Sequence, residues 1–266
     1  MNKTKQLCKE LRIKILETAF SAGSASAHIG GALSCVEIIS TIFNKCNFDY
    51  HLSNKDKLIL SKGHACLSLY GILNIFGYIS DSELKTFEKD NSYYPGHPVI
   101  NIEKGIHYSS GSLGNGLSFS CGLALSELIK KSDIKIFTIL GDGECNEGII
   151  WEALMFAKKY NLNNLYIFVD HNKFQQTGSN EEIMDMNNLE EKIASFGLKT
   201  FRVNGHDISA LEECIDKGSS INKPKAIIAD TVKGKGVSFI ENNNEWHHKI
   251  LSETLLNEAI NEINNA

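Results

Sequence analysis

GDGECNEGIIWEALMFAKKYNLNNLYIFVDHNK, residues 141–173, is the stretch of the chain that says most about its fold. An apolar run, IKIFTIL (134–140), ends directly before it, and a second apolar run, LYIFVD (165–170), lies near its end. Between the two runs, GIIWEALMFAKKY (148–160) has apolar residues at helical spacing. A strand, a helix and a second strand in this order are typical of a parallel sheet that helices cover on both faces.

The same alternation extends along the rest of the chain. The further predicted strands are 56–61, 199–204 and 225–231, and the further predicted helices are 34–45, 113–131, 188–195, 208–218 and an amphipathic tail at 252–266. Residues 91–111 are rich in Gly, Ser, Tyr and Pro and are predicted to form a long functional loop. No repeat or linker divides the chain. We therefore expect a single three-layer α/β domain over residues 1–266, with a central, mostly parallel sheet flanked by helices on both faces.

Composition excludes several classes of function. The net charge of -5 argues against nucleic acid as the main partner. No run reaches the roughly 18 apolar residues that a membrane span needs, and the charged N-terminus has no apolar signal core. The seven cysteines are scattered and odd in number, which predicts free, mostly buried thiols rather than disulfides or a zinc site. We expect a cytoplasmic protein that binds neither membranes nor nucleic acid.

Two polar side chains follow neighbouring predicted strands. Asp142 comes after the run 134–140, and Asn172 comes after the run 165–170. Ligands of such sheets bind at the carboxyl ends of the strands, and carboxylate and amide oxygens suit Mg²⁺, with Ca²⁺ as a possible substitute. Gly141 and Gly143 would let the backbone approach a phosphate closely. A Gly-Asp-Gly after a strand is by itself more often only a turn, so the motif needs support from the rest of the chain.

That support comes from a resemblance. Residues 141–172 resemble the thiamine-diphosphate signature, in which Gly-Asp-Gly is followed by Asn one strand–helix–strand unit later. Five more segments resemble transketolase segments and follow that family's order: SAHIGGALS (26–34), SKGHACLSLYGIL (61–73), YPGHP (94–98), SSGSLGNGLSFSCGLAL (109–125) and VKGKGVSFIENNNEWHHK (232–249). The chain is therefore similar to the N-terminal, thiamine-diphosphate-binding subunit of two-piece transketolases.

The resemblance implies roles for individual residues. The expected metal ligands are Asp142, Asn172 and the main-chain carbonyl of Phe174. The expected contacts to thiamine diphosphate are His64, Gly111, Leu113, Gly141, Asp142, Gly143, Glu144, Asn172 and His247. The expected catalytic residues are His28, His97 and His247. Of these, His28 and His97 would bind hydroxyls of the donor sugar and transfer protons, and His247 would lie on the cofactor side. Histidine suits that task because its unperturbed pKa lies near neutrality, although any single one of these imidazoles could equally be a surface or core residue.

Three other residues leave alternatives open. Lys233 and Lys235 could add positive charge near the diphosphate, or they could form a solvated basic turn. His248 occupies a position where the family has Gly, which adds an imidazole at the mouth of the channel and leaves the identity of the sugar open.

The resemblance also implies a partner. Complete transketolases are much longer and carry a pyrimidine-binding domain, whose glutamate hydrogen-bonds the aminopyrimidine ring of the cofactor. We expect that domain and its glutamate on a C-terminal transketolase-type subunit, with an α2β2 assembly. The expected reaction transfers a two-carbon ketol unit from a ketose phosphate to an aldose phosphate, using thiamine diphosphate and Mg²⁺. The alternatives are a decarboxylating relative that makes a deoxyketose phosphate, and a non-catalytic scaffold.

Overall fold

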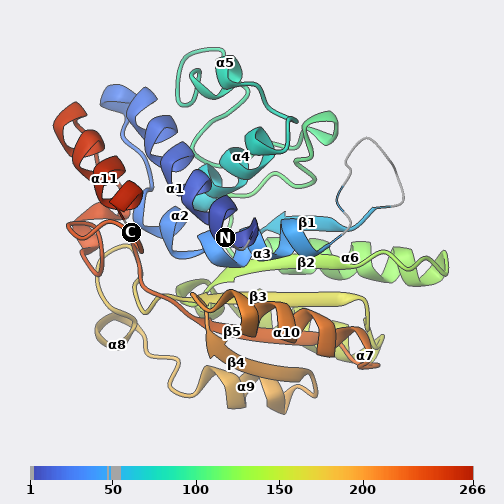
Figure 1. The fold of residues 1–266 in the computed structure, drawn as a ribbon. Coiled ribbons are helices and arrows are strands. Elements are labelled where there is room, and N and C mark those ends of the chain that lie inside the picture. The colour runs from blue at the N-terminus through green and yellow to red at the C-terminus, as the bar shows by residue number, and fades with distance from the viewer. Residues whose placement is uncertain (1–2, 47, 49–54, 266) are drawn as a thin grey trace.

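The computed structural model describes residues 3–46, 48 and 55–265. Its centre is a five-stranded sheet in the order β1-β2-β3-β5-β4, in which all neighbouring strands are parallel. Figure 1 shows the strands stacked through the middle of the molecule with helices on both sides. The predicted α/β fold is confirmed. The strands are β1 (Lys57–Leu60), β2 (Ile136–Gly141), β3 (Leu165–His171), β4 (Lys199–Asn204) and β5 (Lys225–Asp230).

The helices alternate with the strands along the chain. The α-helices are α1 (Lys3–Ser21), α2 (Gly30–Ser34), α3 (Val36–Lys45), α4 (Cys66–Ile75), α5 (Asp81–Leu84), α6 (Asn115–Ile129), α7 (Gly148–Lys159), α8 (Asn180–Ile183), α9 (Leu189–Ser195), α10 (Ile208–Ser219) and α11 (Glu253–Asn265). Short 3-10 turns are η1 (Gly23–Ala25), η2 (Gly63–Ala65), η3 (Ile102–Lys104), η4 (Gly143–Asn146) and η5 (Asn244–His247). Each predicted strand and helix is present, with ends that differ by a few residues.

Alternate residues of the central strands enter two separate cores, one on each face of the sheet. In β2, Phe137 and Ile139 belong to the core formed with α1, α3, α4, α10 and α11. Ile136 and Leu140 belong to the core formed with α6, α7 and α9. Every residue of β2 is buried, which explains why the strand has a nearly continuous apolar sequence rather than an alternating one.

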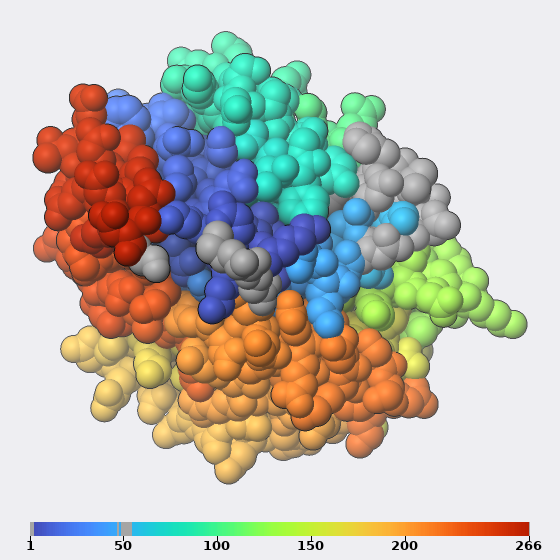
Figure 2. Space-filling view, viewed as in Figure 1, coloured from blue at the N-terminus to red at the C-terminus, as the bar shows by residue number. Residues whose placement is uncertain are grey.

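The C-terminal helix α11 packs within the chain. Its buried side chains are Leu256, Ala259 and Ile263, and it lies against α1. Figure 2 shows this helix in red covering one flank of the N-terminal region, which is blue. The predicted amphipathic tail helix is confirmed, and its apolar face is covered by the chain itself.

The structure also bears on the predicted loop, the cysteines and the possibility of membrane-spanning helices. Residues 91–111 contain only the turn η3 and an isolated bridge between Asn101 and Ile106, so the predicted loop is confirmed. All seven cysteines lie in the described part of the chain, where each is a free thiol and six are buried. Among the residues that the structure describes, no helix combines the length and the apolar character required to cross a bilayer.

One glycine allows the start of α6 to pack against the end of β1. A Cβ atom at Gly116 would lie 2.6 Å from the Cβ and 2.7 Å from the Cα of Ser61. The same helix contains Gly122, which is exposed and has no heavy atom of another residue within 4 Å of its ideal Cβ. The two glycines therefore test close packing against intrinsic helix propensity within a single helix.

We predict opposite effects on stability for alanine at these two positions. Gly116→Ala should destabilise the chain by about 1–3 kcal/mol, because overpacking displaces the helix from β1. Gly122→Ala should stabilise it by about 0.5–1 kcal/mol, because alanine loses less backbone entropy in a helix. Urea unfolding followed by circular dichroism measures both changes. A Gly116→Ala chain as stable as the unsubstituted chain would contradict the packing described.

Candidate functional site: a cavity at the strand tips

A cavity of about 550 Å³ opens at the carboxyl ends of the central strands. It lies where parallel sheets of this type bind their ligands. The cavity brings together every residue predicted for the site, from segments far apart in the sequence. Those lining residues are His28, His64, His97, Gly111, Leu113, Gly141, Asp142, Gly143, Glu144, Asn172, Phe174 and His247.

Asp142 and Asn172 lie at the same edge of the sheet because β2 and β3 are parallel neighbours, with Gly141 opposite Asp170. The Asp142 carboxylate accepts the N–H of Gly143 at 2.8 Å and the N–H of Lys173 at 2.6 Å. Each of its oxygens keeps capacity for a further ligand. Asp142 and Asn172 are buried and line one cavity, which is the arrangement that the spacing of the two strands predicts.

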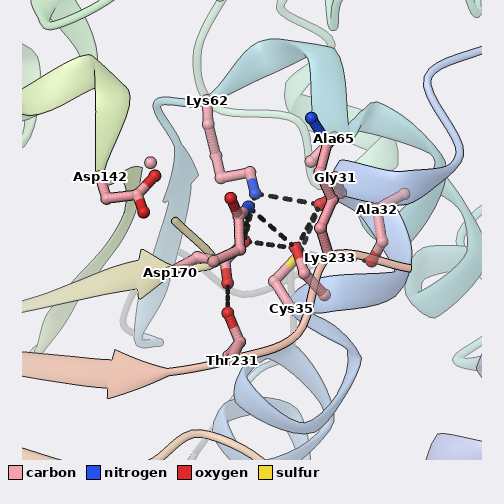
Figure 3. Close-up of polar contacts among 12 residues, drawn as sticks. Gly31, Ala32, Cys35, Lys62, Ala65, Asp142, Asp170, Thr231 and Lys233 are labelled. Atoms are coloured by element: carbon pink, nitrogen blue, oxygen red, sulfur yellow. Dashed lines mark hydrogen bonds and ion pairs between the residues drawn. The ribbon is translucent and has the colours of Figure 1, made fainter. Parts of the chain in front are cut away.

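A buried ion pair lies directly beneath these two residues. The Lys62 ammonium pairs with the Asp170 carboxylate, and both side chains are fully buried. Figure 3 shows Lys62 extending from the end of β1 to Asp170, with Asp142 beside them on the neighbouring strand tip. Asp170 also accepts hydrogen bonds from the hydroxyls of Ser34 and Thr231. The carboxylate is therefore surrounded by donors.

This pair affects the protonation of the site. Burial, and then the negative charge of Asp170, raises the pKa of the Asp142 carboxyl. Burial alone would raise the pKa of Asp170 too, but the Lys62 ammonium and the hydrogen bonds to Asp170 hold it below its ordinary value. Burial would lower the pKa of Lys62, and the Asp170 charge raises it instead. The pair is thus ionised at neutral pH.

Four of the predicted histidines form a cluster on the other side of the cavity. The ring centroid of His28 lies 5.8 Å from that of His64, 5.6 Å from that of His97 and 5.3 Å from that of His247. The ring of His248, which is exposed, lies 4.4 Å from that of His28 at a tilt of 49°. Its Nδ1 shares a hydrogen bond with the hydroxyl of Ser26. The imidazole at the family's Gly position therefore extends the cluster outwards.

The half-buried imidazoles of His28, His64 and His247 are neutral near pH 7. Burial, followed by the neighbouring histidines and Lys233, lowers the pKa of His28 to about 3. Burial, followed by the lysine charges, lowers the pKa of His247 to about 4. The pKa of His64 is also well below its ordinary value, chiefly through burial. A neutral imidazole carries one donor and one acceptor nitrogen, so these side chains can accept a proton from a hydroxyl group.

Lys233 is not part of a solvated turn. Its side chain is 1% exposed, and its ammonium donates to the Gln175 carbonyl at 3.1 Å and the Asn244 side chain at 2.6 Å. It also lies 3.1 Å from Nδ1 of His247. Burial, and then the charge of Lys62, lowers the pKa of Lys233 to about 8. Of the two alternatives that the sequence left open for Lys233, the structure therefore supports a buried positive charge and not a solvated turn. Lys235 instead forms a partly exposed ion pair with Glu241.

The carboxylate of Glu144 accepts hydrogen bonds from the protein itself. It accepts hydrogen bonds from the Ser61 hydroxyl at 2.5 Å, the Gly114 N–H at 2.8 Å and the Gly141 N–H at 2.9 Å. Burial raises its pKa, although these bonds oppose the change. Glu144 therefore joins three segments of the cavity wall, and its contact with a cofactor remains a prediction. Glu147 is exposed at the rim of the same cavity.

The donor set of the cavity fits a divalent ion that carries a diphosphate. Asp142 and Asn172 offer hard oxygen ligands, and Lys62 and Lys233 are buried cations close by. Within the described part of the chain, the buried Nε2 of Gln175 and Oδ1 of Asn146 have no hydrogen-bond partner, and both residues line the cavity. Buried polar atoms are rarely left unsatisfied, which points to a polar ligand. A Cβ at Gly143 would lie 2.8 Å from Gln175, so this turn has room only for glycine.

Sequence reasoning missed several residues of the site. Lys62 sits inside the transketolase-like segment 61–73, and Asp170 ends an apolar strand run, but neither carries a motif of its own. The rule that strand ends carry functional groups could have identified both. Gln175 and Asn146 also lack a motif, and only the fold brings them to the cavity.

Comparisons with known proteins identify the family of the chain. The family described as "Transketolase, thiamine diphosphate binding domain" matches residues 4–263. An apulose-4-phosphate transketolase subunit of Actinobacillus succinogenes is 37% identical over 247 residues, which cover 91% of this chain and 89% of that protein. The 6-deoxy-6-sulfo-D-fructose transketolase subunit SqwG of Clostridium sp. (strain MSTE9) is 35% identical over 241 residues, which cover 89% and 88% of the two chains.

A solved structure supports the fold independently. Transketolase from Leishmania mexicana superposes with a TM-score of 0.92 at 23% identity. The match covers 99% of this chain and 42% of that one, so the present chain spans less than half of that enzyme. The resemblance drawn from the motifs is confirmed: the chain belongs to the transketolase family of transferases and matches its N-terminal, thiamine-diphosphate-binding domain.

Proposed function

We propose that this chain is the N-terminal subunit of an enzyme that transfers a two-carbon ketol unit from a ketose or ketose phosphate to an aldose or aldose phosphate. The observation that carries the proposal is that the predicted ion ligands and the predicted histidines line one cavity together. A ketol transferase needs ion ligands to fix the diphosphate of the cofactor, and it needs proton-accepting side chains to deprotonate the sugar hydroxyls. Thiamine diphosphate, when bound, supplies the nucleophilic carbon and the electron sink of the reaction.

At the diphosphate end, Asp142, Asn172 and the carbonyl of Phe174 would hold Mg²⁺. The main-chain groups of Gly141, Gly143 and Glu144 would lie against the phosphates, and the buried ammonium of Lys233 would balance their charge. Gly143 and Glu144 lie in η4, directly after the end of β2 at Gly141, and all three line the cavity, which supports this assignment. Gly111 and Leu113, on the loop opposite, would approach the aminopyrimidine.

At the substrate end, His28 and His97 would bind hydroxyls of the donor sugar and transfer protons, and His247 would act from the cofactor side. The lowered pKa values of His28 and His247 keep both imidazoles neutral near pH 7, so each can accept a hydrogen bond or a proton from a hydroxyl group. His64 would contact the diphosphate or the thiazolium side of the cofactor. His28 and His97, which suit the hydroxyls of a sugar, favour polyhydroxylated donors over the pyruvate of a decarboxylating relative.

We propose that the chain forms one diphosphate-binding domain and that a partner chain provides the pyrimidine-binding domain and its glutamate. Two relatives that match along about nine tenths of their length are themselves named as transketolase subunits. An α2β2 assembly with cofactor sites between the chains would follow. The seven free thiols support a place in the cytoplasm.

The partner should be essential for activity. We expect the purified chain with Mg²⁺ and thiamine diphosphate to show no ketol transfer, and the chain co-expressed with its C-terminal counterpart to show it, because the glutamate that activates the cofactor is on the second chain. A coupled assay with ketose phosphate and aldose phosphate measures both preparations. Full activity from this chain alone would contradict the proposal.

Asp142→Ala should abolish binding of thiamine diphosphate with Mg²⁺, because the ion loses its only carboxylate ligand among the expected three. Isothermal calorimetry on the chain with its partner measures the loss. Asp216→Ala is a matched control, since Asp216 is an exposed carboxylate that pairs with Lys45 on the surface. The control should bind the cofactor as the unsubstituted chain does. Equal binding by Asp142→Ala would remove the basis of the proposed ion site.

His28→Ala should lower kcat/KM for the donor sugar by about 10²-fold or more, because a positioned acid–base group is lost. The dissociation constant for thiamine diphosphate should stay close to that of the unsubstituted enzyme, since His28 is assigned to the substrate and not to the cofactor. Steady-state kinetics and calorimetry on the same preparation separate the two effects. A variant with unchanged kcat/KM would show that His28 has no part in the reaction.

A further inference from the structure

We propose that the buried ion pair of Lys62 and Asp170 holds Asn172 in the orientation that the ion site requires. Asp170 fixes the amide of Asn172 so that its oxygen, and not its nitrogen, is presented to the ion, and Lys62 keeps Asp170 in place. The inference rests on the proposed function only in taking Asn172 as an ion ligand. It gives a role to two residues that the proposed function does not assign to the ion, the cofactor or the substrate.

The contacts of Asn172 determine which way its amide faces. Its Nδ2 donates to Oδ2 of Asp170 at 3.2 Å and lies 3.5 Å from the hydroxyl of Ser34. Its Oδ1 accepts the N–H of Phe174 at 3.1 Å. An ionised carboxylate accepts hydrogen bonds but cannot donate them, so only the amide nitrogen can face Asp170. The oxygen is then directed away from Asp170, on the side of the Phe174 main chain.

Lys62 provides the counter-charge that this arrangement requires. Asp170 has no exposed surface, and an unpaired carboxylate at such a position would be very unfavourable. The Lys62 ammonium pairs with the same oxygen, Oδ2, that holds Asn172. Lys62 and Asn172 therefore share one oxygen of Asp170, and loss of the ammonium would remove the buried cation that holds this oxygen beside the amide.

The same ammonium reaches the histidine side of the cavity. Lys62 Nζ donates to the carbonyl of Gly31 at 3.0 Å, as the dashed line in Figure 3 shows. Gly31 lies in α2, which directly follows the segment that carries His28. Ser34, in the same helix, donates to Oδ2 of Asp170 at 2.5 Å. The pair thus fixes the strand tip of Asn172 and the helix next to His28 relative to each other.

Two double variants without charge at positions 62 and 170 separate the effect of the oxygen at residue 170 from the effect of its charge. Lys62→Met/Asp170→Asn removes both charges but keeps an oxygen that can accept from Asn172, while its NH₂ can donate to Thr231. Lys62→Met/Asp170→Leu removes both charges and the oxygen. Replacing a buried ion pair with uncharged side chains is often tolerated. In both variants the Ser34 hydroxyl, which lies 3.1 Å from the Gly31 carbonyl, can donate to it in place of the lost ammonium. The local net charge is the same in the two variants and in the unsubstituted chain.

The experiment measures ion affinity rather than activity. Mn²⁺, which accepts the same oxygen ligands as Mg²⁺, is titrated into each chain in complex with its partner, with thiamine diphosphate at saturation. Electron paramagnetic resonance reports the free ion, and thermal unfolding reports stability. We expect the leucine variant to bind Mn²⁺ about 10–100-fold more weakly, which is the usual effect of losing the partner of a metal ligand. The asparagine variant should bind like the unsubstituted chain.

The outcomes distinguish the orienting role of Asp170 from the proposed function of the chain. Equal affinities for the leucine and asparagine variants would overturn the orienting role of Asp170 and leave the proposed function intact. An equally large loss in the asparagine variant would overturn it as well, since the charge rather than the oxygen would then matter. If the leucine variant is not recovered folded, Lys62→Met/Asp170→Ala replaces it. No binding of Mn²⁺ by the unsubstituted complex would instead overturn the proposed function itself.

Discussion

The parallel pairing of β2 and β3 is the constraint on which the rest of the site depends. Because Gly141 lies opposite Asp170 in this register, the residues that follow both strands leave the sheet at one edge, and Asp142 and Asn172 line one cavity. A slip of one residue would send every side chain of a strand to the opposite face of the sheet. The buried, apolar strands on both faces make such a slip costly, so the two cores of the protein determine the geometry of its cavity.

Electrostatics explains why so many charged groups can be buried together at this edge. Asp142 and Asp170 face Lys62 and Lys233 in a region with almost no exposed surface. Lys62 compensates Asp170 within the protein, which leaves the Asp142 carboxylate and the Lys233 ammonium near the cavity. A cation beside Asp142 and an anion beside Lys233 would complete the balance. A metal ion with a diphosphate has this combination of charges.

The sequence predicts the part of this structure that periodicity and local motifs encode. The strands and helices could be located because apolar runs and helical spacing extend over many residues, and the parallel order follows from their alternation. The residues of the cavity wall could be named only where a family motif marks them. Lys233 illustrates the limit, since its burial depends on contacts with Gln175 and Asn244, and no local pattern specifies contacts between such distant segments.

The central claim is that Asp142 and Asn172 jointly hold a divalent ion that fixes a diphosphate. The most direct measurement is a crystal structure of the chain with its partner, grown with Mn²⁺ and thiamine diphosphate, using anomalous scattering to locate the metal. We predict one peak at the tips of β2 and β3, at coordination distance from a carboxylate oxygen of Asp142, the amide oxygen of Asn172 and phosphate oxygens, at roughly 2.0–2.2 Å. A peak elsewhere, or an ion bound without either side chain, would contradict the account.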